Sequence, residues 1–96
     1  MKQYLLGIDN GSTMVKAALF GTDGTEVAVA GRKVDLLAPR PGWSEVDMEA
    51  LWQLTAEAIR EAVSKANIDA AEIAAVACTG HGNGLYLVDA AGRPVR

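Results

Sequence analysis

Polar residues that follow the first apolar segment have the composition of a phosphate-binding turn. The stretch GIDNGSTMVKAAL, residues 7–19, places an aspartate, two glycines, two hydroxyl side chains and a lysine within ten positions. Phosphoryl chemistry at such a turn needs outward-pointing backbone N–H groups, a carboxylate for Mg²⁺, and hydroxyl or cationic groups beside them. The residues that could fill these roles are Asp9 for the metal ion, and Gly11, Ser12, Thr13 and Lys16 for the phosphates. The pattern therefore predicts a cradle for the phosphates of a nucleotide and its metal ion.

The same residues also suit a simple hairpin turn that binds no ligand. Asp, Asn, Gly, Ser and Thr are the usual turn residues, and an Asn-Gly pair alone favours a hairpin. A Walker A loop is excluded, because the pattern G-x-x-x-x-G-K-[ST] is absent and no helix is expected after the turn. Side-chain alternation places Met14 and Lys16 on one face of the following strand, which leaves open whether Lys16 reaches the turn.

Strands must hold this turn on both sides. Apolar runs predict strands at residues 3–9, 14–21 and 26–34, and an Asp-Gly hairpin signal joins the second to the third. The three strands are therefore expected to form an antiparallel meander. The proline-containing segment 36–47 follows and is expected to be an irregular connector.

A helix is predicted after the connector. Apolar positions repeat at helical spacing over residues 51–66. Asp47 is the expected N-cap, and Glu49 lies in the first turn, where the helix dipole favours negative charge. Glu45 and Asp47 are both assigned to the start of the helix rather than to a catalytic acid pair.

Other side chains near this helix have ordinary structural explanations. Glu61 precedes Lys65 by four residues, the favourable order for a surface ion pair. Trp43 and Trp52 could stack on a sugar, but the preferred interpretation is that they pack the connector against the helix.

Two further strands are predicted after the helix, at residues 73–80 and 85–89. The first is apolar throughout and is expected to be covered on both faces, with Cys78 as an inert core residue. The helical crossover implies that the first and fourth strands lie parallel in one sheet. The order β-β-β-α-β-β, with a mixed sheet, predicts an α/β domain that is incomplete, as if the chain were the front of a longer protein.

Composition narrows the class of protein further. The chain has 96 residues, a net charge of −3 and a pI near 5.0, without the basic stripe that binding to nucleic acid requires. Its apolar runs are far shorter than a membrane span, and its first residues lack a signal-peptide pattern. The single cysteine cannot form an internal disulfide, which suits a reducing compartment. We therefore expect a cytoplasmic protein that binds neither nucleic acid nor membrane.

Three motifs, in order, resemble those of one kinase family. The hairpin GIDNGSTMVKAALF is similar to the first phosphate-binding hairpin of actin-like, sugar-kinase and heat-shock ATPases, whose pattern is G-[IL]-D-x-G-[ST]-[ST]-x-x-K. The segment PRPGWSEVDMEALW, residues 39–52, resembles the P-x-P-G-W-x-E-x-D-x-x-x-x-W stretch of the FGGY carbohydrate kinases. The segment AVACTGHGNGLYLVDAAGRPVR, residues 75–96, has the placement of that family's strand, substrate loop and strand. The resemblance covers the whole chain.

This resemblance implies a ribonuclease H-like or actin-like ATPase fold. Residues 1–96 would form the N-terminal part of the first, sugar-binding domain of a two-domain kinase. The resemblance assigns Asp9 to Mg²⁺, and it assigns Gly11, Ser12, Thr13 and Lys16 to the phosphates of ATP. The family's catalytic base, an aspartate, would lie beyond Arg96, so this chain would hold no catalytic residue.

The resemblance also places a sugar-binding loop at HGNG, where Gly82 and Asn83 would help to hold the substrate. Glycerol kinases have Arg-Glu at these positions and many D-xylulose kinases have Met-His. The Gly-Asn pair favours a ketopentose such as xylulose over glycerol. His81 either offers hydrogen bonds to the sugar or caps the strand end. The expected partners are thus a sugar or polyol and ATP, and a homodimer is left open.

Two other kinds of protein remain as alternatives. One is a non-kinase ATPase of the same superfamily, a chaperone or a filament protein, which would share the first hairpin but has no reason to carry the segment 42–52. The other is an α/β binding module without catalytic activity, in which every glycine serves only a turn.

Overall fold

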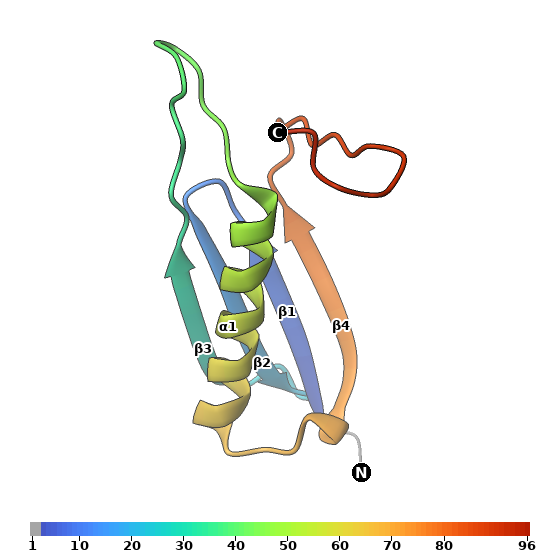
Figure 1. The fold of residues 1–96 in the computed structure, drawn as a ribbon. Helices are drawn as coiled ribbons and strands as arrows, with labels where there is room; N and C mark the ends of the chain where they lie inside the picture. Colours follow the sequence, from blue (N-terminus) through green and yellow to red (C-terminus); the bar gives the residue numbers. More distant parts are fainter. Residues whose placement is uncertain (1–2) are drawn as a thin grey trace.

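The computed structural model describes residues 3–96 as a four-stranded sheet with one long helix packed on one face (Figure 1). The elements in chain order are β1 (Tyr4–Asn10), β2 (Met14–Gly21), β3 (Glu26–Lys33), α1 (Met48–Ala66), the short 3₁₀ helix η1 (Ala70–Glu72) and β4 (Ile73–Gly80). The sheet order is β3-β2-β1-β4, in which only the β1–β4 pair is parallel. The α/β class, the antiparallel meander and the parallel pairing of the first and fourth strands are confirmed.

Alternation along the strands divides the sheet into a face covered by α1 and a face that α1 does not cover. The buried core lies between the sheet and α1, and its buried members are Leu6, Ala17, Leu19, Ala30, Ala58 and Ala62. Because the two helix residues of this core are alanines, α1 can lie close to the strands. The helix lies mainly over β2 and β3 (Figure 1), so these two strands carry most of the hydrophobic burial.

Polar caps define both ends of α1. The Asp47 side chain accepts hydrogen bonds from the backbone N–H groups of Glu49, at 2.9 Å, and Ala50, at 3.2 Å. This confirms Asp47 as the N-cap and starts the helix three residues before the periodic apolar segment. The helix ends at Asn67, which has a left-handed backbone with φ of 54°.

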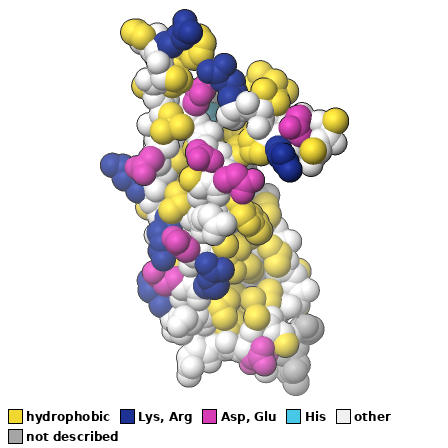
Figure 2. Space-filling model, in the orientation of Figure 1, with side chains coloured by type: hydrophobic (Ala, Val, Ile, Leu, Met, Phe, Trp, Pro, Cys, Tyr) yellow, Lys and Arg dark blue, Asp and Glu magenta, His cyan; other side chains and the backbone are white. Residues whose placement is uncertain are grey.

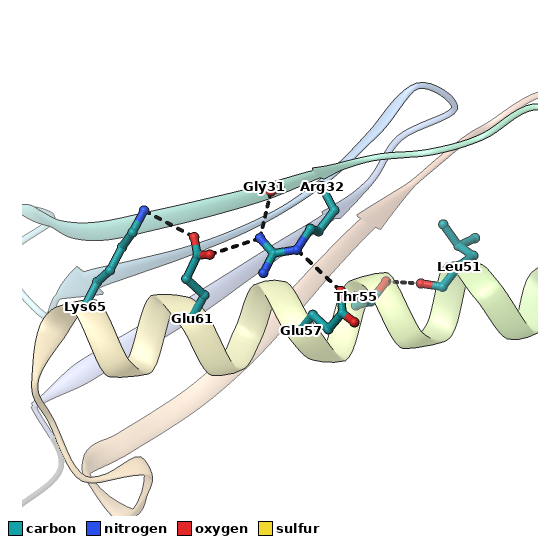
Figure 3. A network of polar contacts seen from close by, with 7 residues as sticks. All are labelled: Gly31, Arg32, Leu51, Thr55, Glu57, Glu61 and Lys65. Carbon is teal, nitrogen blue, oxygen red and sulfur yellow. Dashed lines mark hydrogen bonds and ion pairs between the residues drawn. The ribbon is translucent and has the colours of Figure 1, made fainter.

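An ion-pair network joins α1 to β3 (Figure 3). The Arg32 guanidinium lies 3.4 Å from Glu57 and 3.1 Å from Glu61, and Glu61 also pairs with Lys65 at 3.2 Å, as predicted from their spacing. Lys65 in turn donates to the backbone carbonyl of Val29 at 3.0 Å. The hydrogen bond from Lys65, followed by the charge of Arg32, lowers the pKa of Glu61 below its ordinary value.

The prediction that β4 is covered on both faces is wrong. In residues 3–96, β4 pairs only with β1 and lies at the edge of the sheet, beyond the part that α1 covers (Figure 1). Val76 is 56% exposed, and Cys78 is an exposed free thiol rather than a core residue. Figure 2 shows hydrophobic side chains that remain visible beside the helix on this face.

The predicted fifth strand at residues 85–89 is also wrong. This segment makes one isolated bridge, between Val88 and Pro94, because no neighbouring strand among the described residues pairs with it and Pro94 has no N–H to extend the ladder. The Asp89 side chain closes the intervening turn by accepting from the N–H groups of Ala91 and Arg93. The described segment is therefore an irregular loop with a tight turn.

The connector between β3 and α1 forms a long loop that extends beyond the end of the sheet (Figure 1). Leu37 and Glu45 form a bridge in it, and Glu45 also pairs with Arg96, so Glu45 does not serve the start of the helix as predicted. Trp43 contacts two guanidinium groups. The centre of its ring lies 5.2 Å from Cζ of Arg40 and 5.0 Å from Cζ of Arg96.

The prediction that the tryptophans pack the connector against the helix is wrong. Trp43 is 43% exposed and Trp52 is 62% exposed. Trp52 lies on the solvent side of α1, because the helix face that meets the sheet is occupied by Thr55, Ala58 and Ala62.

As for membranes, none of the helices in residues 3–96 combines the length and the apolar character that a crossing needs.

Candidate functional site

The turn between β1 and β2 presents backbone amides at the end of the sheet. Gly11 donates its N–H to the Met14 carbonyl at 3.0 Å, and Val34 donates to the Thr13 carbonyl at 2.8 Å. A Cβ on Gly11 would lie 2.8 Å from the Met14 oxygen, so only glycine fits here. Among residues 3–96, the amides of Ser12 and Thr13 have no acceptor, and both residues are exposed. Two backbone donors thus face solvent, where a phosphate could accept from them.

Asp9 and Lys16 lie on the other side of the sheet from the helix. They are direct partners in the β1–β2 ladder, and Thr79 of β4 is the partner of Asp9 on its other edge. Ile8 packs against the core under α1, so the alternation sends Asp9 to the uncovered face. Asp9, Lys16 and Thr79 line a shallow pocket of about 500 Å³ there.

A second pocket, of about 580 Å³, joins the turn to the loop after β4. The turn contributes Gly11 and Ser12, and the loop contributes His81 and Asn83. The structure therefore brings together two groups of predicted site residues that are some 70 positions apart in the chain. Its other walls come from the connector, from the first turn of α1 and from residues 84–87.

Not every predicted site residue lines this pocket. Thr13 and Gly82 lie outside it, while Asp9 and Lys16 belong to the pocket on the other face. The open question about Lys16 is thus answered by its pairing: it lies beside Asp9 and not beside Ser12. The turn adjoins both groups, because Gly11 and Ser12 line the larger pocket and a Cβ on Gly11 would lie 3.8 Å from Asp9 Oδ1.

Of the two roles that the sequence left open for His81, the structure shows the one at the strand end. The backbone N–H of His81 donates to the Asn10 carbonyl at 3.1 Å, which continues the β1–β4 pairing past the end of β4. Its ring contacts Tyr86: Nδ1 lies 3.3 Å from the Tyr86 hydroxyl, and the rings meet edge to face. The imidazole is exposed, as is Asn83, so both can form hydrogen bonds with a ligand in the pocket.

Two glycines of this loop have different reasons to be glycine. A Cβ on Gly84 would lie 2.4 Å from the Tyr86 ring and 2.9 Å from His81 Nδ1, so the His81–Tyr86 contact requires glycine at position 84. A Cβ on Gly82 would meet no atom within 4 Å. The fold therefore permits a side chain at position 82, and its absence leaves space beside Asn83.

Sequence reasoning missed two site residues. Tyr86 was assigned to a strand, although an aromatic residue two positions after a glycine was the available signal. Asn10 was counted only as a turn residue, yet its side-chain amide donates to the Thr55 hydroxyl of α1 at 2.7 Å. Thr55 was counted with the apolar stripe of the helix, so nothing in either local pattern indicated this contact.

Comparison with known proteins identifies the family. Residues 4–96 match the model of the FGGY family of carbohydrate kinases, N-terminal domain. The chain is 35% identical over 92 residues to the "Probable L-xylulose kinase" of Haemophilus influenzae, and 35% identical over 95 residues to the "L-xylulose/3-keto-L-gulonate kinase" of Escherichia coli K12. A glycerol kinase of Petrotoga mobilis is also 35% identical, over 96 residues.

The solved structures agree with this assignment. The crystal structure of xylulose kinase from Rhodospirillum rubrum matches 98% of this chain with a TM-score of 0.87 and 29% sequence identity. The three sequence alignments include 96–99% of this chain. They cover only 19% of the length of each relative. Its mixed sheet and crossover helix are part of an actin-like ATPase domain. The chain belongs to the FGGY family of carbohydrate kinases and corresponds to part of its N-terminal domain.

Proposed function

We propose that the full-length protein is an ATP-dependent carbohydrate kinase, and that residues 3–96 supply its phosphate turn and part of its sugar site. The observation that carries this proposal is the 580 Å³ pocket, which Gly11 and Ser12 share with His81 and Asn83. A kinase must hold the phosphate donor and the sugar acceptor side by side, and a pocket built from both predicted sites meets that need.

The two ligands of the kinase would bind on different sides of the β1–β2 hairpin. The triphosphate would approach the turn from the side of Asp9 and Lys16, and the sugar would occupy the pocket lined by His81 and Asn83. The amides of Ser12 and Thr13, for which residues 3–96 offer no acceptor, would stabilise charge on the transferred phosphoryl group. The base that deprotonates the sugar hydroxyl would be an aspartate beyond Arg96.

The residues present fit a phosphate-bound Mg²⁺ ion better than an all-protein metal site. Among residues 3–96, no three His, Cys, Asp or Glu side chains cluster to hold a metal. Asp9 is a single exposed carboxylate beside the turn, and Mg²⁺ in kinases is usually held by one or two carboxylates together with substrate phosphates. When bound, the ion would neutralise phosphate charge, and Asp9 would hold it in place directly or through water.

A ketopentose such as xylulose is the proposed substrate. Two of the relatives named above carry L-xylulose kinase names, and the loop offers an amide at Asn83 and an imidazole at His81 for hydrogen bonds rather than a clamp of opposite charges. Glycerol is the second candidate, because the Petrotoga mobilis glycerol kinase is equally similar.

The test is a coupled assay of ADP release by the full-length protein, with ketopentoses, glycerol and no acceptor in separate reactions. We expect ADP release that depends on the acceptor and is fastest with a ketopentose. Faster release with glycerol would replace the proposed substrate by the second candidate. Equal release with and without any acceptor would contradict the kinase assignment and favour a chaperone- or filament-type ATPase.

A further inference from the structure

Asn10 is the point at which three parts of the molecule meet. It is the last residue of β1, and the next residue, Gly11, begins the phosphate turn. Its carbonyl accepts the backbone N–H of His81 at 3.1 Å, which holds the start of the sugar loop. Its side-chain amide donates to Thr55 Oγ1 at 2.7 Å, which holds α1. One residue thus touches the turn, the loop and the helix.

The residue that α1 contributes to this junction is polar and buried. Thr55 is 6% exposed and is the one buried polar side chain among the described residues. Its hydroxyl donates to the Leu51 carbonyl at 2.8 Å, as Figure 3 shows, so its lone pairs are left to accept from Asn10. The direction of both bonds is therefore fixed, and with it the orientation of the Asn10 amide.

Packing alone does not require this pair. The core between sheet and helix consists of aliphatic side chains, and Thr55 follows Leu51 on the same apolar stripe. Valine has nearly the same shape as threonine and would fill the site without a buried hydroxyl. A polar pair here stabilises the fold little compared with apolar contacts, but it sets where Asn10 lies relative to the helix.

We propose that Asn10 is a positioning residue, held by Thr55, that fixes the phosphate turn and the sugar loop in one geometry. This inference rests on the proposed kinase function. Transfer of a phosphoryl group between two bound molecules is sensitive to displacements of about 1 Å. The Asn10–Thr55 hydrogen bond would prevent such displacements by tying the end of β1, and with it both site segments, to the longest element of the described chain.

The test uses four single variants of the full-length protein and the double variant that combines Thr55→Val with Asn10→Ala. Thr55→Val removes the acceptor with little change of shape, and Asn10→Ala removes the donor while leaving the helix intact. Thr55→Ser keeps the hydroxyl and is the rescue variant. Ala62→Gly, deep in the core toward the other end of α1, is the control that destabilises the helix without touching the junction.

We expect the variants at the Asn10–Thr55 junction to change kcat, and the control variant to change only the stability of the fold. Thr55→Val and Asn10→Ala should each lower kcat about tenfold, and the double variant should be no slower than Asn10→Ala alone, because both remove one interaction. Thr55→Ser should stay within about twofold of the parent protein. Ala62→Gly should lower the unfolding temperature while kcat and both KM values of the folded protein stay unchanged.

Hydrogen exchange supplies a readout that does not depend on turnover. Amide exchange in peptides covering His81 and Gly11 should be faster in Thr55→Val than in the parent, and unchanged there in Ala62→Gly. If the parent protein released no acceptor-dependent ADP, the proposed function would fail, and the exchange data would still decide the positioning role. An active parent whose Thr55→Val and Asn10→Ala variants keep both kcat and His81 exchange would overturn the inference. If Thr55→Val does not fold, Asn10→Ala decides alone.

Discussion

The β1–β2 turn at residues 11–13, which we propose binds phosphate, and the loop at 81–87, which we propose binds the sugar, differ in how the fold holds them. The turn at 11–13 lies between two paired strands, is closed by a backbone hydrogen bond and allows only glycine at its first position. The loop at 81–87 has one backbone bond to β1 and one from the Val95 N–H to the Leu87 carbonyl, and the contact between His81 and Tyr86 shapes the rest. A turn fixed by strand pairing suits chemistry that is the same for every substrate. A loop shaped by its own side chains can change its substrate without disturbing the sheet.

Removal of the Asp9 carboxylate should give the largest effect. Asp9→Ala in the full-length protein should lower acceptor-dependent ADP release by roughly 1,000-fold, because Mg²⁺ would lose its protein anchor. Asp23→Ala is the matched control: Asp23 closes the β2–β3 turn by accepting from the Thr25 N–H at 3.0 Å, an interaction that also lowers its pKa. Turnover that is unchanged in Asp9→Ala would remove Asp9 from the site.

A methyl group at the turn should have the next largest effect. Gly11→Ala puts a Cβ 2.8 Å from the Met14 carbonyl, so the turn backbone must shift and kcat should fall by about 100-fold. Gly7→Ala, in the preceding strand β1, meets atoms no nearer than 3.8 Å and serves as the control. Full activity of Gly11→Ala would show that the turn geometry is not needed for transfer.

A methyl group in the loop should act on the sugar alone. Gly84→Ala displaces the Tyr86 ring, and we expect KM for the sugar to rise about tenfold while KM for ATP is unchanged. Tyr86→Phe should raise the KM for the sugar about threefold, because the hydroxyl contact with His81 is lost. Steady-state kinetics with each substrate varied separately measures both. An equal rise of the two KM values would contradict the separation of turn and loop.

The smallest expected effect concerns stability and pH. The pKa of Glu61 is lowered in the folded protein, so its ion pairs stabilise the fold above the ordinary glutamate pKa of 4.5 and are lost as pH falls through the lowered value. Glu61→Gln should therefore lower the unfolding temperature slightly at pH 7, and not at a pH below that lowered value. Glu26→Gln in β3 is the control, because the described residues give Glu26 no ion pair. A difference that persists at the lowest pH would contradict this account.

Much of the fold followed from local sequence patterns. The bounds of β2 and β4 were predicted as observed, and Asp47 was found as the N-cap, because apolar runs, turn residues and caps are local signals. The burial of β4 was not predictable in this way. An apolar strand indicates that something covers it, but the pattern does not say which residues do, and none in 3–96 covers Cys78.

The site was predictable in its parts but not in its assembly. The turn and the HGNG loop were identified by residue type and resemblance, and the structure places them along one pocket. The Asn10–Thr55 contact spans 45 positions and joins two residues that each look ordinary locally. That Asp9 lies on the face of the sheet opposite α1 follows from strand alternation, although it became clear only once the helix face was known. The cytoplasmic location and the homodimer stay predictions.

A crystal structure of the full-length protein with a non-hydrolysable ATP analogue and a ketopentose would show whether the β1–β2 turn binds phosphate. We expect phosphate oxygens within hydrogen-bond distance of the Ser12 and Thr13 amides, and the sugar against Asn83 and His81. A nucleotide whose phosphates lie far from the turn, with the sugar outside this pocket, would contradict this proposal.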